Sequence, residues 1–385
     1  MPDDTTLDPT VTPETLLSDD DRPKGGKLEE GAALCLSGGG YRAMLFHLGT
    51  LWALNDHRWL QKLDRISSVS GGSITAGVLG MNWTSLSFDG GRATNFGELV
   101  VNPIRKLARK TLDVKAVLNG LFKTGSINDK LTAAYDKELF KKKTLQHLPD
   151  RPRFVINATS VQSGALFRFS RPYVWDYRVG RIDNAPISLA AAVGASSAFP
   201  PLLSPAAIDL TKFTIVPGSG TDLQKPPYTQ RAILTDGGVY DNMGIETAWK
   251  RYRTILVSDA GGKMQADAKP AVNAVQHSLR VNGVIDNQVR SLRKRQVISS
   301  FGKTRQGAYW GIRSDIANYA VAGALPAPLP RTMELAETPT RLAEMPAELQ
   351  ERLINWGYAI TDAAMRKHVD KKLTAPQGFP YPRGI

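Results

Sequence analysis

Residues 32–54 read AALCLSGGGYRAMLFHLGTLWAL, and this stretch sets the pattern from which the fold can be predicted. Its first five residues form a short, continuous apolar run, which is typical of a strand buried on both faces. Ser37 and three glycines break the run, and from Tyr41 to Asn55 leucines and a tryptophan recur as a broad apolar helix face. The stretch therefore predicts a buried strand, a glycine-rich turn and a helix.

The same order of elements recurs further along the chain. A second short strand is predicted from Asp64 to Val69, and after Ser70-Gly71-Gly72 a helix is predicted from Ile74 to Met81. We expect further strands at 154–159, 166–170, 232–235 and 254–258, and helices at 188–194, 243–252, 281–300 and 347–369. This alternation predicts an α/β fold whose central sheet is mostly parallel and is flanked by helices.

Composition excludes several classes of protein. With 385 residues, 42% hydrophobic and 22% charged, the chain is neither collagen-like nor a coiled coil nor wholly disordered. One cysteine, Cys35, excludes a disulfide framework and a multi-cysteine zinc site, and five scattered histidines make a histidine-built metal centre improbable. No apolar run reaches the roughly 18 residues that span a bilayer, and the acidic start is unlike a signal peptide. We expect no metal, no cofactor and a cytoplasmic location.

The charge is unevenly distributed. Residues 1–27 carry a net charge of −4, and we expect them to form a mobile tail. Because the whole chain carries +13, the remaining residues carry about +17. Bases crowd residues 102–153 among apolar residues, which predicts a basic helical insertion. Two interpretations of this insertion stay open: its lysines form a solvated face, or it is a lid or membrane-facing subdomain.

A glycine loop lies between the first strand and helix. Gly38, Gly39 and Gly40 allow backbone N–H groups to converge on one point, and the helix that follows adds partial positive charge. Such a loop suits an anion, although the run could also be only a tight strand–helix junction. It lacks the lysine of a Walker A loop and the spacing G-x-G-x-x-G, so a nucleotide site is weakly indicated.

Two further motifs follow predicted strands. Ser68-Val69-Ser70-Gly71-Gly72 is similar to the nucleophile elbow G-x-S-x-G, with Ser68 in place of the first glycine. Asp236-Gly237-Gly238 places a carboxylate at a strand end, where it could reach across an α/β crevice. The alternative for Asp236 is a turn in which it caps its own backbone; Asp241 and Asn242 are candidate helix caps.

Taken in order, the three motifs resemble those of the patatin-like phospholipase family, over residues 32–259. The small-residue stretch 195–200 resembles one that such proteins carry before the aspartate. The resemblance implies a three-layer patatin-like fold and a dyad of Ser70, the nucleophile, and Asp236, the base. It also implies an oxyanion hole and supporting residues in the motifs: Gly38, Gly39 and Gly40 for the hole, and Arg42, Gly71, Gly72, Gly237 and Gly238 in support. We expect Arg42 to brace the loop or contact an anionic headgroup, and His47 to be structural.

The resemblance implies a lipid acyl hydrolase of the phospholipase A or lysophospholipase type, working through an acyl-serine intermediate. The expected substrate is a phospholipid or lysophospholipid, with peripheral contact to anionic membrane and no specific nucleic-acid binding. Two alternatives stay open: a nucleotide- or phosphate-binding regulatory protein in which Ser70 is structural, and a soluble esterase or acyltransferase with the same dyad. The expected domains are the tail 1–27, a catalytic domain 28–310 with the insertion 102–153, and a C-terminal extension 311–385 ending in a helix.

Overall fold

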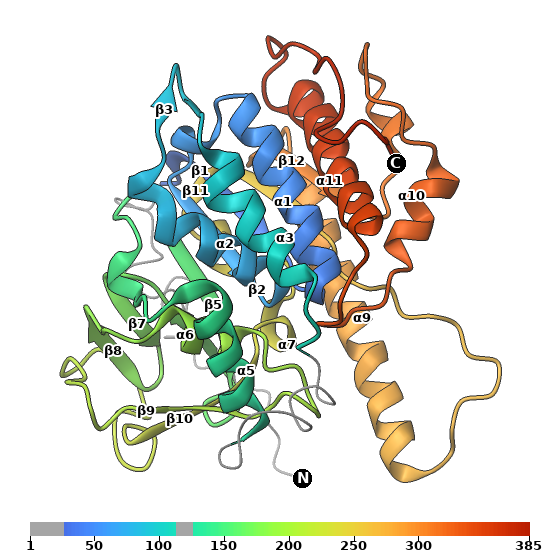
Figure 1. The fold of residues 1–385 in the computed structure, drawn as a ribbon. Coiled ribbons are helices and arrows are strands. Elements are labelled where there is room, and N and C mark those ends of the chain that lie inside the picture. The colour runs from blue at the N-terminus through green and yellow to red at the C-terminus, as the bar shows by residue number, and fades with distance from the viewer. Residues whose placement is uncertain (1–26, 113–125) are drawn as a thin grey trace.

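A large sheet runs through the molecule and is parallel through its centre (Figure 1). The computed structural model describes residues 27–112 and 126–385, so the predicted tail, apart from Lys27, lies outside the described residues. In their order across the sheet, the parallel strands are β12 (Gln306–Gly311), β11 (Tyr252–Asp259), β1 (Glu29–Leu36), β2 (Arg65–Val69) and β5 (Arg153–Ser160). This order confirms the predicted α/β fold with a mostly parallel central sheet and flanking helices.

Antiparallel strands extend the sheet beyond β5. They are β6 (Leu166–Phe169), β7 (Tyr173–Asp176) and β8 (Gly180–Asp183) on one path, and β10 (Arg231–Asp236) and β9 (Ala206–Asp209) on another. A small separate hairpin joins β3 (Phe88–Asp89) to β4 (Arg92–Ala93).

One pairing brings two strand ends together. β2 runs parallel to β5, and its last pair is Val69 with Asn157. β10 runs antiparallel to β5, and its last residue, Asp236, pairs with Ala158, the next residue of β5. The carboxyl ends of β2 and β10 therefore meet end to end beside β5, although they lie far apart in the sequence.

Helices cover both faces of the sheet. The longer ones are α1 (Gly40–Asp56), α2 (Gly71–Asn82), α3 (Asn102–Ala108), α5 (Ile127–Tyr135), α6 (Leu189–Ser196), α9 (Ala274–Ser300), α10 (Leu329–Ala336) and α11 (Ala347–His368). The short ones are α7 (Gly238–Asp241), α8 (Glu246–Trp249), η3 (Leu60–Lys62), η4 (Trp83–Ser85), η5 (Gly97–Val101), η6 (Asp136–Phe140), η7 (Leu145–His147) and η8 (Ile316–Tyr319).

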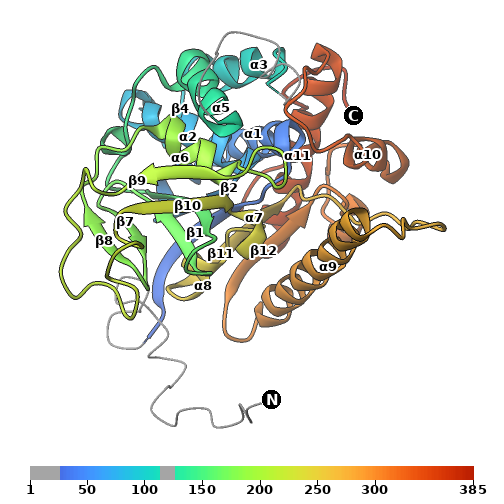
Figure 2. The same cartoon turned by 90° about the horizontal axis from the view of Figure 1, so that it is seen from below.

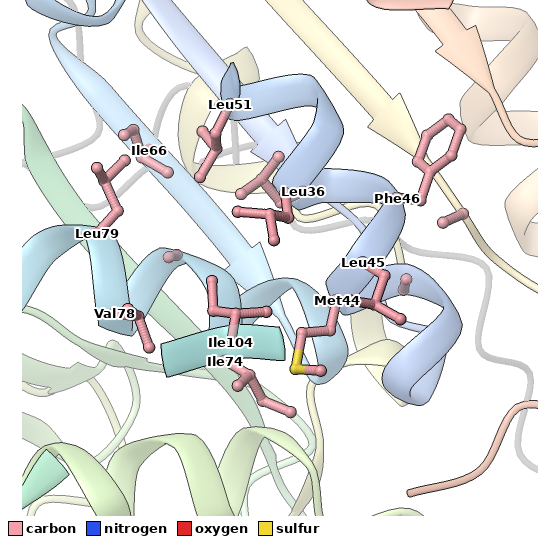
Figure 3. Packing of buried hydrophobic residues seen from close by; sticks show 14 of the residues in the cluster. Leu36, Met44, Leu45, Phe46, Leu51, Ile66, Ile74, Val78, Leu79 and Ile104 are labelled. Atoms are coloured by element: carbon pink, nitrogen blue, oxygen red, sulfur yellow. The ribbon is translucent and has the colours of Figure 1, made fainter. Parts of the chain in front are cut away.

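Alternating side chains of the central strands divide the core. Leu34 and Leu36 of β1 join the main cluster with α1 and α2, and Figure 3 shows Leu36 among residues of both helices. Ala33 and Cys35, on the other face of β1, pack with α8 in a smaller cluster. This division makes the molecule three layers deep, since a strand points successive side chains to opposite faces.

One predicted helix is wrong. The sequence suggested a helix over 243–252, but only α8 is helical there, and Tyr252 already belongs to β11. Gly244 adopts φ +67°, which ends regular helix geometry. The Asp241 carboxylate accepts hydrogen bonds from the N–H groups of Met243 (3.2 Å) and Glu246 (2.7 Å), so it caps the shorter helix instead.

The described parts of the basic segment 102–153 pack into the main core. Leu107 of α3 and Leu131 and Phe140 from the segment after the gap are buried there. Arg105 pairs with Glu351 at 2.7 Å, and Lys110 pairs with Glu138 at 2.5 Å. The lysines at 141–143 are exposed, whereas Lys115 and Lys123 lie outside the described residues.

Residues after 310 also contribute to the core. α11 lies against α1, and Trp356 contacts Phe46 edge to face at 6.5 Å between ring centres. The Thr50 and Thr361 hydroxyls are hydrogen-bonded across the two helices at 2.9 Å. Within the described residues, none of the helices combines the length and the apolar character that a membrane crossing requires.

Candidate active site

Ser70 lies at the sharp turn between β2 and α2. Its backbone angles are φ 50° and ψ −119°, and its side chain is partly exposed. A residue other than glycine at positive φ costs about 1–3 kcal/mol, so the surrounding structure must hold it there. This geometry fits the predicted elbow, because a strained strand-to-helix turn projects its hydroxyl away from the sheet.

The glycines beside Ser70 are there because the backbone passes too close for side chains. A Cβ on Gly71 would overlap the carbonyl oxygen of Gly40, and one on Gly72 would lie 2.6 Å from that of Leu36. Gly237, after Asp236, would likewise overlap the carbonyl oxygen of Asn157. These supporting glycines therefore let the elbow, the glycine loop and the end of β10 approach one another.

Asp236 is buried at the end of β10 and faces the elbow. Its carboxylate accepts a hydrogen bond from the Gly238 N–H at 2.7 Å and is hydrogen-bonded to the Ser70 side chain. Loss of solvation on burial raises the pKa of Asp236, and the two hydrogen bonds lower it by a smaller amount. The resulting pKa is about 7. A carboxylate with this pKa, in contact with a hydroxyl, is able to exchange a proton with it near neutral pH.

Ser196, at the end of α6, ties the elbow to the aspartate loop. Its hydroxyl accepts a hydrogen bond from the Ser70 N–H at 2.9 Å and is hydrogen-bonded to the Ser73 hydroxyl at the same distance. Its carbonyl accepts from the Gly237 N–H at 3.3 Å. Only the family resemblance pointed to residues 195–200 in the sequence. The local pattern could not reveal the contact, because Ser70 and Ser196 lie 126 residues apart.

The glycine loop lies directly against Ser70. A Cβ on Gly38 would lie 3.3 Å from the Cβ of Ser70. The Gly38 N–H donates to the Asn242 carbonyl at 3.0 Å, whereas no described residue accepts a hydrogen bond from the N–H of Gly39 or Gly40. Gly39 and Gly40 adopt φ +146° and +61°, which glycine tolerates. Two of the three predicted donors are therefore unpaired among the described residues.

Two helix N-termini converge at this point. α1 begins at Gly40 and α2 begins at Gly71, whose backbones pack together. The N-terminus of a helix carries partial positive charge, so a negative charge that develops beside Ser70 is stabilised by both helices.

Arg42 braces the loop from behind. Its guanidinium donates to the carbonyls of Thr338 at 2.6 Å, Ala260 at 2.9 Å and Ala336 at 3.2 Å. Burial lowers the pKa of Arg42 to about 10. Of the two roles expected for this residue, bracing fits its surroundings, since the side chain is only 3% exposed.

His47 and His57 have partners other than Ser70 and Asp236. His47 is buried, with Nε2 2.9 Å from the Ser37 carbonyl oxygen and Nδ1 2.9 Å from the Ser258 hydroxyl; burial lowers its pKa to about 4. His57 pairs with Asp362 at 2.9 Å. The hydrogen bonds of the described residues place no imidazole on Ser70 or Asp236. Residues 27–112 and 126–385 also hold no cluster of three side chains suited to a metal ion.

The sequence of this region matches a family model. The model, described as patatin-like phospholipase, covers residues 34–249, which is more than half of the chain. The chain belongs to the patatin-like phospholipase family. A comparison with curated proteins gave no match.

A comparison with solved structures gave matches at low sequence identity. Human GIVD cytosolic phospholipase A2 matches with a TM-score of 0.53 and 13% identity, over 90% of this chain and 62% of that one. VipD from Legionella pneumophila matches with a TM-score of 0.36 and 15% identity, over 88% and 68%. The chain thus spans less than two thirds of the human protein, and at this identity the likeness concerns the fold.

Asn242 is a site residue whose position the sequence did not indicate. Its side-chain oxygen lies 2.6 Å from where a Cβ would stand on either Gly38 or Gly238. The sequence suggested only a helix cap here, but the residue connects the glycine loop to the aspartate motif. Asx residues are common in turns, and nothing in the local pattern distinguishes this one.

Proposed function

We propose that the protein is a lipid acyl hydrolase of the phospholipase A or lysophospholipase type, with Ser70 as nucleophile and Asp236 as general base. One observation carries the proposal: a strained elbow serine is hydrogen-bonded to a buried aspartate whose pKa is about 7. Membership of the patatin-like phospholipase family supports an ester of a lipid as substrate.

The chemistry divides into two steps. The Ser70 hydroxyl oxygen attacks the ester carbonyl while its proton passes to the Asp236 carboxylate. The tetrahedral intermediate collapses, the proton goes to the departing alcohol oxygen, and an acyl-serine remains. Water then attacks the acyl-serine, giving its proton to Asp236, and the fatty acid leaves as Ser70 regains its hydrogen.

The glycine loop would stabilise the charge that forms in both steps. The N–H groups of Gly39 and Gly40, which have no described acceptor, and the start of α2 would supply the donors for the oxyanion of an ester bound at Ser70. Removing one such donor costs other enzymes about 3–4 kcal/mol of transition-state stabilisation. Gly38, with its N–H already engaged, would contribute close packing against Ser70 instead.

We also propose peripheral contact with anionic membranes. The chain carries a net charge of +13, and each base near an anionic surface contributes about 1 kcal/mol of attraction. Attraction of this kind is screened by salt, so it would act together with apolar contacts rather than alone.

A fluorophosphonate probe tests the nucleophile. The probe should label the wild type at Ser70, while Ser70→Ala should show no labelling and no release of fatty acid from phospholipid by mass spectrometry. Ser163→Ala is the control, since the Ser163 hydroxyl likewise contacts an aspartate, Asp176, but lies in a turn after β5 and not at the elbow. Labelling of Ser70→Ala at another serine would overturn the assignment.

The same experiment separates the two alternatives. A regulatory phosphate-binding protein would release no fatty acid in either form. A soluble esterase or acyltransferase would lose labelling in Ser70→Ala, yet its wild type would cleave short soluble esters and leave vesicle phospholipid intact.

A further inference from the structure

Helix α9 projects from the body near α7, the short helix that follows Asp236 (Figures 1 and 2). It is 27 residues long, and of these only Val297 and Ser300 are buried. Most helices of a globular protein bury a continuous apolar face, so a long helix with almost no buried residue needs a different explanation.

The exposed side chains of this helix are unusually apolar. Val275, Leu279 and Ile285 are exposed to 71%, 49% and 52%. Among the described residues, the large apolar side chains that stand exposed all lie at 272–298 or beside the site motifs, except for Val161 and Leu329. Those beside the motifs are Phe199, Leu202 and Val239. A concentrated apolar surface of this kind usually marks an interaction site.

Both groups of exposed apolar residues are tied to the candidate active site. Val239 comes directly after the Asp236 motif, and Phe199 follows Ala198, whose carbonyl accepts the Asp236 N–H at 2.9 Å. From α9, Arg290 donates to the Gly262 carbonyl at 2.6 Å, and a Cβ on the neighbouring Gly261 would meet both Arg290 and Asn242. α9 is therefore anchored to the loop that borders the glycine motif.

The positive charge of α9 indicates what kind of partner its exposed surface would bind. Its basic residues are Arg280, Arg290, Arg293, Lys294 and Arg295, and its one acidic residue is Asp286. A helix with exposed apolar residues and bases is typical of one that lies in the interface of an anionic membrane. A second copy of the chain would bring the same positive helix against itself in a symmetric dimer, which the like charges oppose.

We infer that the exposed apolar residues of 272–292, together with Phe199, Leu202 and Val239, form a docking face for the surface of an anionic phospholipid bilayer. Docked in this way, the protein places Ser70 where an acyl ester can enter from the bilayer. The inference rests on the proposed function, because it takes a bilayer lipid as the substrate.

Vesicle binding tests the docking face. The protein carries Ser70→Ala, so that binding is measured without turnover, and the vesicles contain phosphatidylglycerol and phosphatidylcholine. The triple variant Val275→Gln, Leu279→Gln and Ile285→Gln should bind about tenfold or more weakly, since three apolar side chains no longer enter the interface. Leu329→Gln, at an apolar residue exposed to 39% on α10, is the matched control and should bind normally.

A fluorescent probe reports insertion directly and does not depend on that variant's folding. Cys35 is buried, so a thiol introduced by Val275→Cys is the accessible one for an environment-sensitive dye. Its emission should shift to the blue on anionic vesicles and stay unchanged on pure phosphatidylcholine. The same dye at Lys212→Cys, on an exposed residue after β9, should not shift.

Four outcomes overturn the docking face. In the vesicle assay they are unchanged binding of the triple variant, or an equal loss of binding in Leu329→Gln. The other two are an unshifted dye emission at position 275, and a wild-type dimer, seen by light scattering, that the triple substitution dissociates. Loss of binding only in Lys141→Glu, Lys142→Glu and Lys143→Glu would assign docking to that basic face instead. With Ser70 intact, the triple variant should cleave a soluble ester at the wild-type rate. Failure of the proposed function would instead appear as hydrolysis that survives Ser70→Ala.

Discussion

The surroundings of Asp236 place its pKa near neutral pH, so both protonation states are populated there. Burial raises its pKa to about 7, and only the ionised form can take the proton of Ser70. We therefore expect kcat/KM for a soluble ester to rise about tenfold per pH unit below pH 7 and to level off above it. Rates measured between pH 5 and 9 check this. A profile that is flat across pH 7, or one that falls above it, would contradict the assignment of Asp236 as base.

Asp236→Asn is the matched variant for that profile. Asparagine keeps an oxygen to accept the Gly238 N–H but removes the basic group, so activity should be lost at every pH while the fold persists. Measurable activity with an unchanged pH profile in this variant would point to another base.

Helix α6 contacts the candidate site only at its C-terminal end. A substitution at each end of this helix therefore separates an effect on the site from an effect on helix stability. Ser196→Ala removes the hydroxyl that accepts the Ser70 N–H, at a cost of about 1–1.5 kcal/mol, so kcat should fall about tenfold with KM nearly unchanged. Ser188→Ala removes the cap at the other end, where the hydroxyl accepts the Ala191 N–H at 3.1 Å. That variant should lose about 1 kcal/mol of folding stability and keep its kcat. Equal kinetic losses in both would mean that Ser196 acts only through stability.

The elements that the sequence predicts well are those whose pattern is local. β1, β2, α1 and α11 follow from continuous apolar runs or helical spacing, and the serine and aspartate motifs lie where two of the predicted strands end. The meeting of β2 and β10 on β5 could not be predicted, because it depends on pairing between residues 65–69, 153–160 and 231–236. The exposure of the apolar residues of α9 could not be predicted either: the sequence predicts a basic helix over 281–300, but its pattern does not reveal that the valines and leucines of this helix face outward.

At the scale of the whole molecule, the core includes the chain beyond the residues that match the family model. α1 and α11 cross so closely that a Cβ on Gly357 would overlap the Phe46 carbonyl oxygen, and one on Gly49 would overlap that of Ile354. We therefore expect residues 28–112 and 126–385 to unfold as one cooperative unit.

Gly357→Ala tests this cooperative unit. Forcing a methyl group into the helix crossing should lower the free energy of unfolding by about 1–3 kcal/mol, in a single transition followed by denaturant. Gly283→Ala is the control, since its nearest neighbour is the Met264 side chain at 3.9 Å, and alanine in an exposed helix should stabilise by up to about 1 kcal/mol. A separate early transition for the C-terminal helix would show that it folds apart from the rest.

The end-to-end meeting of β2 and β10 has a consequence for how such a protein can diverge. The separation of Ser70 and Asp236 is fixed by the register of two strands on β5, not by the length of chain between β5 and β10. Surface loops within residues 161–230 that lie away from Ser196 and Ala198 can therefore lengthen with little cost, since closing a longer loop adds only about 0.6 kcal/mol per doubling. A shift of one residue along β5, by contrast, would move the pair apart by about 3.3 Å and end catalysis. We expect descendants of this chain to vary in the lobe that carries β7, β8 and β9 while the pairing on β5 stays constant.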